Sequence, residues 1–129
     1  MDNVEALINV GIEKEDDLGC ALTTRFPMAN YQYDCTNDAA PKCHTNNNSN
    51  VFYDACIEQK ELVTETWNFE SIKSMIDKNG LKGKHIVMKI DAEGGEWRGL
   101  RTLPIDYLEY IDQIMFEFHF PGPEMFYQP

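Results

Sequence analysis

Acidic and polar side chains stand where apolar runs of this chain end. Asp34, Asp91, Glu117 and His119 each lie at or near the end of such a run. If the runs are parallel strands, their carboxyl ends meet at one edge of a sheet, where open α/β sheets bind ligands. The pattern therefore predicts a ligand site along that edge.

Gly11 and Asp34 have the spacing of a nucleoside site. Gly11 follows the first apolar run, and a glycine there lets the backbone approach a ligand closely. Asp34 comes 23 positions later. An acid about 20 residues past a glycine turn can accept hydrogen bonds from ribose hydroxyls. The alternative is that Asp34 caps a turn or is simply solvated.

The loop after Gly11 indicates which charge the ligand carries. The Gly-x-Gly-x-x-Gly pattern of dinucleotide sites is absent, and the loop holds Glu13, Glu15, Asp16 and Asp17. These acids would repel a pyrophosphate, which needs hydrogen-bond donors. The loop thus disfavours a nicotinamide oxidoreductase and is compatible with a cationic sulfonium ligand.

Two groups near the ends of the last two runs are candidates for general-base chemistry. Asp91 precedes a glycine pair and is expected to face the ligand crevice. Lys89, inside the same run, would pair with an acid such as Glu117 or extend to the sheet edge. Glu117 and His119 are two positions apart on one run and so share a face. The two side chains either act together as a general base in catalysis or interact in a purely structural role.

Strands and helices alternate along the chain. We expect strands over residues 6–10, 31–34, 51–57, 85–90 and 111–120, and helices over 16–26, 68–79 and 96–103. Asp16 or Asp17 would cap the first helix, Asn68 the second, and Pro104 would stop the third. This alternation predicts an α/β fold with a parallel sheet and helices on both of its faces.

The overall charge excludes some partners. The chain of 129 residues has a formal net charge of −11, which fits one acidic domain. Such a surface repels nucleic acid and anionic membranes. No apolar run approaches the roughly 20 residues that a membrane span needs.

The cysteines leave the compartment open. None of the four lies in a Cys-x-x-Cys pair, so we expect no metal site. Cys35 and Cys43 bracket a short loop and are expected to form a disulfide in an oxidising compartment. Asn47-Asn48-Ser49 is a glycosylation sequon in the same loop. These features are typical of the secretory pathway, and a cytoplasmic protein is the alternative.

Residues 89–96, with the sequence KIDAEGGE, resemble the K-I-D-x-E-G-x-E signature of the FkbM-type methyltransferase family. Residues 97–100 and 114–119 fit the sequence pattern that follows this signature in the family. The chain is also similar to the family's animal methyltransferase-like branch. The resemblance implies a Rossmann-like class I methyltransferase fold and S-adenosylmethionine as cofactor. It further implies methyl transfer to an oxygen, here a hydroxyl of a small molecule or glycan.

The resemblance also assigns cofactor-binding positions. Gly11 matches the glycine of the first cofactor loop, and Asp34 matches the acid that holds the ribose. The end of the third strand, including Asp54 and Ala55, would lie near the adenine. These positions extend the match over most of the chain.

Catalytic positions follow from the same resemblance. Asp91 matches the acid next to the transferred methyl, and Glu93 belongs to the signature without an individual role. Both are expected to bind the cofactor as well. Asp91 and His119 are the candidate bases that would remove the proton of the acceptor hydroxyl.

The family fold has two further strands after the fifth, whereas this sequence stops at Pro129. We therefore expect an incomplete sheet of about five mostly parallel strands, with residues 1–129 forming the cofactor-binding part of a methyltransferase domain. An exposed fifth strand would present an unpaired edge that favours self-association. A degenerate, non-catalytic binding module is the alternative function.

Overall fold

The computed structural model describes residues 3–12, 14–36, 39–42, 50–58, 62–63, 68–92 and 95–117. Its elements in chain order are β1 (Ala6–Val10), α1 (Asp17–Arg25), β2 (Ala29–Tyr33), β3 (Asn50–Tyr53), β4 (Cys56–Ile57), β5 (Leu62–Val63), β6 (Asn68–Glu70), α2 (Ile72–Lys78), β7 (Ile86–Ile90), α3 (Gly95–Thr102), the 3-10 helix η1 (Ile105–Tyr110) and β8 (Ile111–Phe116).

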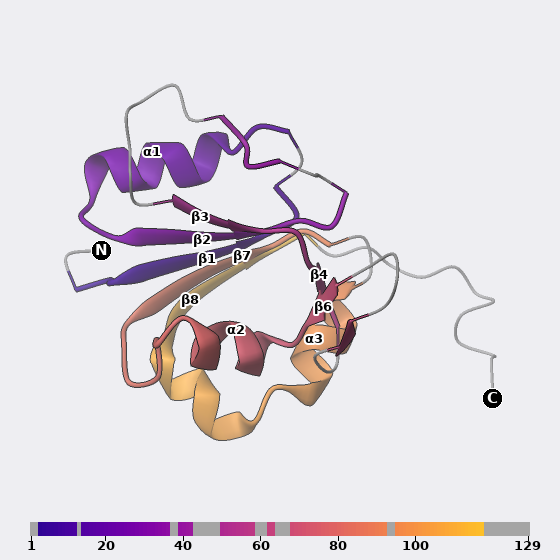
Figure 1. Cartoon of the computed structure of the whole chain (residues 1–129). Coiled ribbons are helices and arrows are strands. Elements are labelled where there is room, and N and C mark those ends of the chain that lie inside the picture. Colours follow the sequence, from indigo (N-terminus) through magenta and orange to yellow (C-terminus); the bar gives the residue numbers. More distant parts are fainter. Residues whose placement is uncertain are drawn as a thin grey trace.

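The main sheet has the strand order β3-β2-β1-β7-β8, and every neighbouring pair is parallel. The chain runs outward from β1 through β2 to β3. It then crosses back and continues on the other side of β1 with β7 and β8 (Figure 1). The strand order thus reverses between β1 and β7, which is where doubly wound sheets bind ligands. The predicted α/β, Rossmann-like sheet is confirmed.

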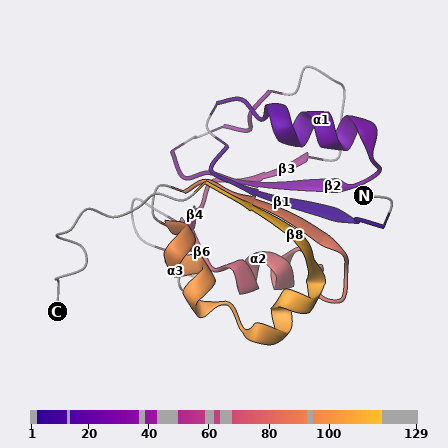
Figure 2. The ribbon, with the colours of Figure 1, turned by 180° about the vertical axis from the view of Figure 1, so that it is seen from behind.

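Helices cover both faces of this sheet. Helix α1 lies on one face, and α2, α3 and η1 lie on the other (Figures 1 and 2). In β1, Ile8 and Val10 belong to the larger apolar core together with α2, whereas Leu7 packs in a smaller core with Leu22 of α1. Because successive side chains of a strand alternate between faces, one buried strand serves both cores.

A buried polar cluster joins α1 to the sheet. Asp16 caps α1 by accepting a 2.8 Å hydrogen bond from the backbone N–H of Gly19. Its carboxylate, which is 4% exposed, also accepts bonds of 2.6–2.8 Å from the side-chain amides of Asn9, Asn30 and Gln32. The predicted cap of the first helix is therefore correct, and the same carboxylate ties the helix to β1 and β2.

The predicted strand over residues 51–57 is wrong in its second half. The main sheet keeps only β3, and Ala55 donates its N–H to Tyr53 O (3.0 Å) in a tight turn. The chain then forms β4, which belongs to a separate sheet of order β4-β6-β5. Ile57 of β4 packs closely against α3. A β-carbon at Gly95 or Gly99 of α3 would lie only 2.6–2.7 Å from the Ile57 side chain. Packing against α3 thus accompanies the change of direction that periodicity alone did not predict.

The helix predicted over residues 68–79 begins later than expected. Asn68 is in β6, where its side chain donates to Asp54 O (3.2 Å), instead of capping a helix. Ser71 is the N-cap of α2 and accepts a 3.0 Å bond from Ser74 N. Pairing of β6 with β4 and β5 holds residues 68–70 in an extended strand, so the helix cannot begin at Asn68.

The remaining predicted elements agree with the structure to within one or two residues where they are described, whereas β5 and η1 were not predicted. Strand β7 and helix α3 lie where they were predicted, and α3 ends before Pro104. Strand β8 forms one edge of the main sheet, with β3 at the other. The last part of the predicted strand, residues 118–120, lies outside the described residues.

The predicted Cys35–Cys43 disulfide is wrong, because Cys35 is bonded to Cys56 with their α-carbons 4.8 Å apart. Parallel pairing of β2 with β3 brings the ends of both strands together, so the two cysteines that follow them become neighbours. Cys20 is also disulfide-bonded. Cys43 and the sequon asparagine Asn47 lie outside the described residues. Among the helices that the structure describes, none is long and apolar enough to cross a membrane.

Candidate functional site

The carboxyl ends of the main strands form a continuous rim. The first residue after each of four strands donates its backbone N–H to the last residue of a neighbouring strand. The donors are Gly11, Asp34, Asp91 and Glu117, with N···O distances of 2.9, 3.2, 3.0 and 3.0 Å. Three residues that the sequence singled out for a nucleoside cofactor, Gly11, Asp34 and Asp91, therefore lie along one edge.

Gly11 lies directly against Asp91 at the point where the strand order reverses. Its φ of +77° is in the left-handed region, and a β-carbon there would collide with the carbonyl oxygen of Asp91. Lys89 extends to the same point. Its ammonium donates to Gly11 O (2.7 Å) and lies 3.9 Å from Asp91 Oδ2. Lys89 thus extends to the sheet edge and also pairs with an acid, Asp91, so the structure shows features of both expected arrangements.

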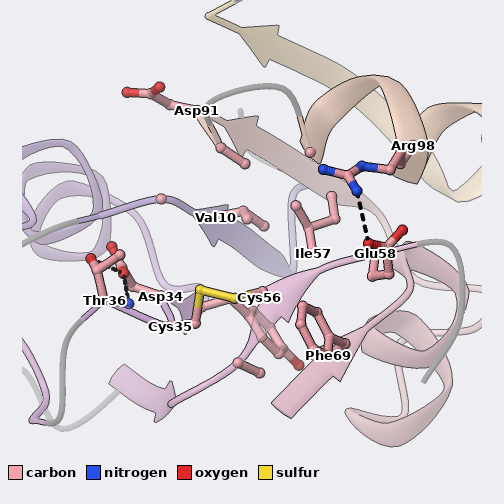
Figure 3. A pocket seen from close by; sticks show the side chains of 15 residues that line it. Val10, Asp34, Cys35, Thr36, Cys56, Ile57, Glu58, Phe69, Asp91 and Arg98 are labelled. Atoms are coloured by element: carbon pink, nitrogen blue, oxygen red, sulfur yellow. Dashed lines mark hydrogen bonds and ion pairs between the residues drawn. A yellow bond between two sulfur atoms is a disulfide. The ribbon is translucent and has the colours of Figure 1, made fainter. Parts of the chain in front are cut away.

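A pocket of about 440 Å³ opens at this rim, a size typical of small-molecule sites. It is lined by the strand ends of the main sheet, the start of the small sheet and the first turns of α3. Figure 3 shows Asp34 and Thr36 at one side, the Arg98–Glu58 pair at the other, and the Cys35–Cys56 disulfide between them. The pocket therefore lies at the predicted edge.

The carboxylate of Asp34 is held in a fixed orientation. It is 6% exposed, and its Oδ1 accepts hydrogen bonds from the backbone N–H (2.7 Å) and hydroxyl (2.6 Å) of Thr36. Asp34 therefore caps a turn, as one of the two interpretations of the sequence expected, and it also lines the pocket.

One wall of the pocket is apolar. Ala55, Ile57 and Phe69 provide it, and the disulfide lies alongside. Ile57 is held in place by the close approach of Gly99 in α3. An apolar wall with an acid at its end suits a flat heterocycle joined to a sugar.

The charged lining of the pocket is net negative. It comprises the carboxylates of Asp34, Glu58 and Asp91 and the guanidinium of Arg98. Arg98 is paired with Glu58 at 3.3 Å, and Lys89 lies close to Asp91 at the rim. Asp34 thus adds a negative charge beside the apolar wall. This lining favours a cation over a pyrophosphate.

A pair of stacked tyrosines adjoins the pocket. Tyr33, which lines the pocket, stacks on Tyr53 with ring centroids 4.8 Å apart. Asn79 links the two, since its amide donates to the Tyr33 hydroxyl (2.8 Å) and accepts from the Tyr53 hydroxyl (2.6 Å). Burial raises the pKa of Tyr33, although the hydrogen bond from Asn79 opposes this shift. The phenol therefore stays neutral and acts as a rigid support for the end of β2.

A second cavity of about 830 Å³ adjoins the first, and Gly11, Thr36 and Asp91 line both. It lies on the α1 side of the rim and adds Ile12, Lys14, Glu15 and Lys89 to its lining. In Figure 3 the side chain of Asp91 points away from the disulfide. Asp91 therefore stands between two spaces, each large enough for a small molecule.

The other predicted site residues differ in where they lie. Ala55 lines the first pocket, whereas Asp54 is exposed and is not part of the pocket lining. Glu93 and His119 lie outside the described residues. Glu96, expected in the first turn of a helix, is there but is fully buried.

Sequence reasoning missed Thr36, Phe69 and Arg98 as lining residues. Thr36 had a local signal, because a Thr two positions after an Asp is typical of a turn that the Asp side chain closes. Phe69 and Arg98 had none, because only the folding of the small sheet against α3 brings them to the rim.

The strand order defines a Rossmann-like α/β domain, and a pocket lies at its switch point. Comparisons with family models, curated proteins and solved structures found no match for this chain. Within the described part of the chain, no group of three His, Cys, Asp or Glu side chains is arranged to hold a metal ion.

Proposed function

We propose that this domain binds S-adenosylmethionine and transfers its methyl group to a hydroxyl of a small molecule or glycan. One observation carries the proposal. Gly11, Asp34, Ala55 and Asp91, chosen from the sequence as cofactor residues, all line one net-negative pocket at the switch point. The resemblance of residues 89–96 to the FkbM-type signature supports the same function.

The residues present fit such a cofactor. Asp34, oriented by Thr36, would accept hydrogen bonds from the ribose hydroxyls. Ile57 and Phe69 would provide an apolar wall for the adenine. Gly11 lines the same pocket and would present its backbone to the cofactor at the reversal of strand order.

The sulfonium group of the bound cofactor supplies the reactive methyl. The domain has to hold the acceptor oxygen in line with that methyl and to assist loss of its proton. Asp91 borders both cavities, so its carboxylate can accept the proton of a hydroxyl held in the second cavity. Lys89, 3.9 Å from Asp91, keeps that carboxylate near the Gly11 loop.

Calorimetric titration with S-adenosylhomocysteine tests the cofactor site. We expect micromolar binding to the unmodified chain. The Asp34→Ala variant should bind about 10-fold or more weakly, since a hydrogen bond to a charged group contributes about 1.5–3 kcal/mol. Asp106→Ala is the matched control, because Asp106 is exposed on η1 and lines neither cavity. Equal loss of affinity in both variants would contradict the assigned role of Asp34.

Two other functions predict different outcomes, one in this titration and one in a thermal-stability measurement. A non-catalytic module would show no heat with S-adenosylhomocysteine. A nicotinamide oxidoreductase would be stabilised against heat by NAD and not by S-adenosylhomocysteine. Binding to the unmodified chain that is lost in Asp91→Ala would support a role for Asp91 beside the reacting methyl.

A further inference from the structure

The Cys35–Cys56 disulfide lies in the wall of the candidate cofactor pocket. Cys35 directly follows Asp34, and Cys56 directly follows Ala55, so each cysteine is next to a proposed cofactor residue. Both cysteines are partly exposed and line the cavity, so a soluble thiol can reach the bond through the pocket.

This bond connects two parts of the fold that otherwise meet through weaker contacts. Asp34 belongs to the rim of the main sheet, where its N–H is bonded to Tyr53 O (3.2 Å). Cys56 begins β4, which pairs with β6 over only two residue pairs. Glu58 N adds one bond to Glu70 O (2.8 Å). A two-residue strand pairing is marginal by itself, so β4 depends on two further restraints, the packing of Ile57 against α3 and the covalent link of the disulfide to the rim.

We infer that the Cys35–Cys56 disulfide holds the pocket in its binding shape and makes ligand affinity depend on the redox state of this pair. The inference rests on the proposed function for the identity of the ligand. With the bond intact, Asp34 and the apolar residue Ile57 keep a constant separation across the pocket. Without it, β4 can move away from the rim while the main sheet stays folded.

The redox step balances with a dithiol as reductant. One thiolate of the dithiol attacks a sulfur of the protein disulfide, the S–S bond breaks, and a mixed disulfide forms. The second thiol of the reductant resolves it. The protein gains two electrons and two protons as the thiols of Cys35 and Cys56, and the dithiol becomes a cyclic disulfide.

The size of the effect follows from how often the reduced pocket keeps its shape. If the reduced rim holds the binding geometry for about one tenth of the time, the apparent affinity falls about tenfold. We therefore expect S-adenosylhomocysteine to bind at least about tenfold more weakly after treatment with dithiothreitol.

Titrations of the unmodified chain and of the Cys35→Ser/Cys56→Ser variant, each with and without dithiothreitol, test this inference. The unmodified chain should lose affinity on reduction, and the variant should bind weakly under both conditions. Cys20 belongs to another disulfide, which the reductant also breaks. A variant that binds as tightly as the unmodified chain and weakens only on reduction would assign the effect to that other bond and overturn the inference.

Hydrogen exchange supplies a readout that does not depend on the ligand. Reduction should accelerate exchange of the Glu58 amide about tenfold, because the β4–β6 pairing opens more often, and should leave the amides of β1 unchanged. Unchanged exchange at Glu58 would overturn the inference whether or not the ligand binds. Equal acceleration in β1 would show a general stabilising role only and would also overturn it. Failure of the oxidised chain to bind S-adenosylhomocysteine, with the Glu58 response intact, would count against the proposed function alone.

Discussion

The α-carbon of Gly11 lies against the carbonyl oxygen of Asp91, so that a side chain at Gly11 would collide with the backbone that follows β7. Lys89 donates to the carbonyl oxygen of Gly11 at 2.7 Å and strengthens the same junction. The two strand ends at the reversal of the sheet order are therefore packed backbone to backbone, and both candidate cavities open beside them.

Replacing Gly11 by alanine should destabilise the domain more than the same change at Gly80. Both glycines have positive φ, +77° and +67°, so alanine is strained at each by about 1–2 kcal/mol. A β-carbon at Gly80 has no neighbour within 4 Å, whereas one at Gly11 meets Asp91 O. Urea unfolding should show an excess destabilisation of at least about 1 kcal/mol in Gly11→Ala. Equal losses would mean that the junction can open without cost.

Asp16→Ala should be among the most destabilising substitutions on the α1 side. It removes the N-cap of α1 and leaves the amides of Asn9, Asn30 and Gln32 without their acceptor. We expect a loss of at least about 3 kcal/mol in the free energy of unfolding.

Asp17→Ala is the matched control for this change, because Asp17 is an exposed acid in the first turn of α1. Its loss should be below about 1 kcal/mol. Similar urea midpoints for the two variants would contradict the role of Asp16 as the buried acceptor that joins α1 to β1 and β2.

Gly99 and Ile57 should be energetically coupled. A β-carbon at Gly99 would lie 2.6 Å from Ile57 Cδ1, the one atom that Ile57→Val removes. Alanine gains about 1 kcal/mol of helix propensity over glycine, but at Gly99 the clash opposes this gain. In a double-mutant cycle, Gly99→Ala should be at least about 0.5 kcal/mol more favourable in the Ile57→Val background. Additive effects would show that β4 moves freely against α3.

The domain should lose stability at alkaline pH through Tyr33. Burial raises the pKa of Tyr33 above the ordinary 10.0 of a tyrosine. The stability that depends on the neutral phenol is therefore fully present below the unfolded pKa and is lost as the pH rises toward the folded pKa.

Urea unfolding at about pH 8 and about pH 11 should reveal this loss, and Tyr33→Phe should reduce the difference between the two. Tyr53 also titrates above its usual range because it is partly buried, so a smaller loss should remain in the variant. A variant with the same alkaline loss as the unmodified chain would remove Tyr33 as the cause.

The sequence by itself determined the main sheet and the residues at its rim. The ends of β1, β2 and β7 follow from where apolar runs stop, and this places Gly11, Asp34 and Asp91 at one edge once the strands are parallel. Asp16 was also predictable as a cap. These features depend on local preferences and on a burial pattern that short stretches of sequence already contain.

Only the tertiary structure decided how the pocket is closed. The partner of Cys35 depends on the parallel pairing of β2 with β3. The break between β3 and β4 and the delayed start of α2 after Ser71 depend on formation of the small sheet. These contacts join segments far apart in the chain, and a two-residue strand such as β4 has no periodicity of its own. Its position is set by the disulfide and by the space that Gly95 and Gly99 leave for Ile57, which are properties of the assembled fold.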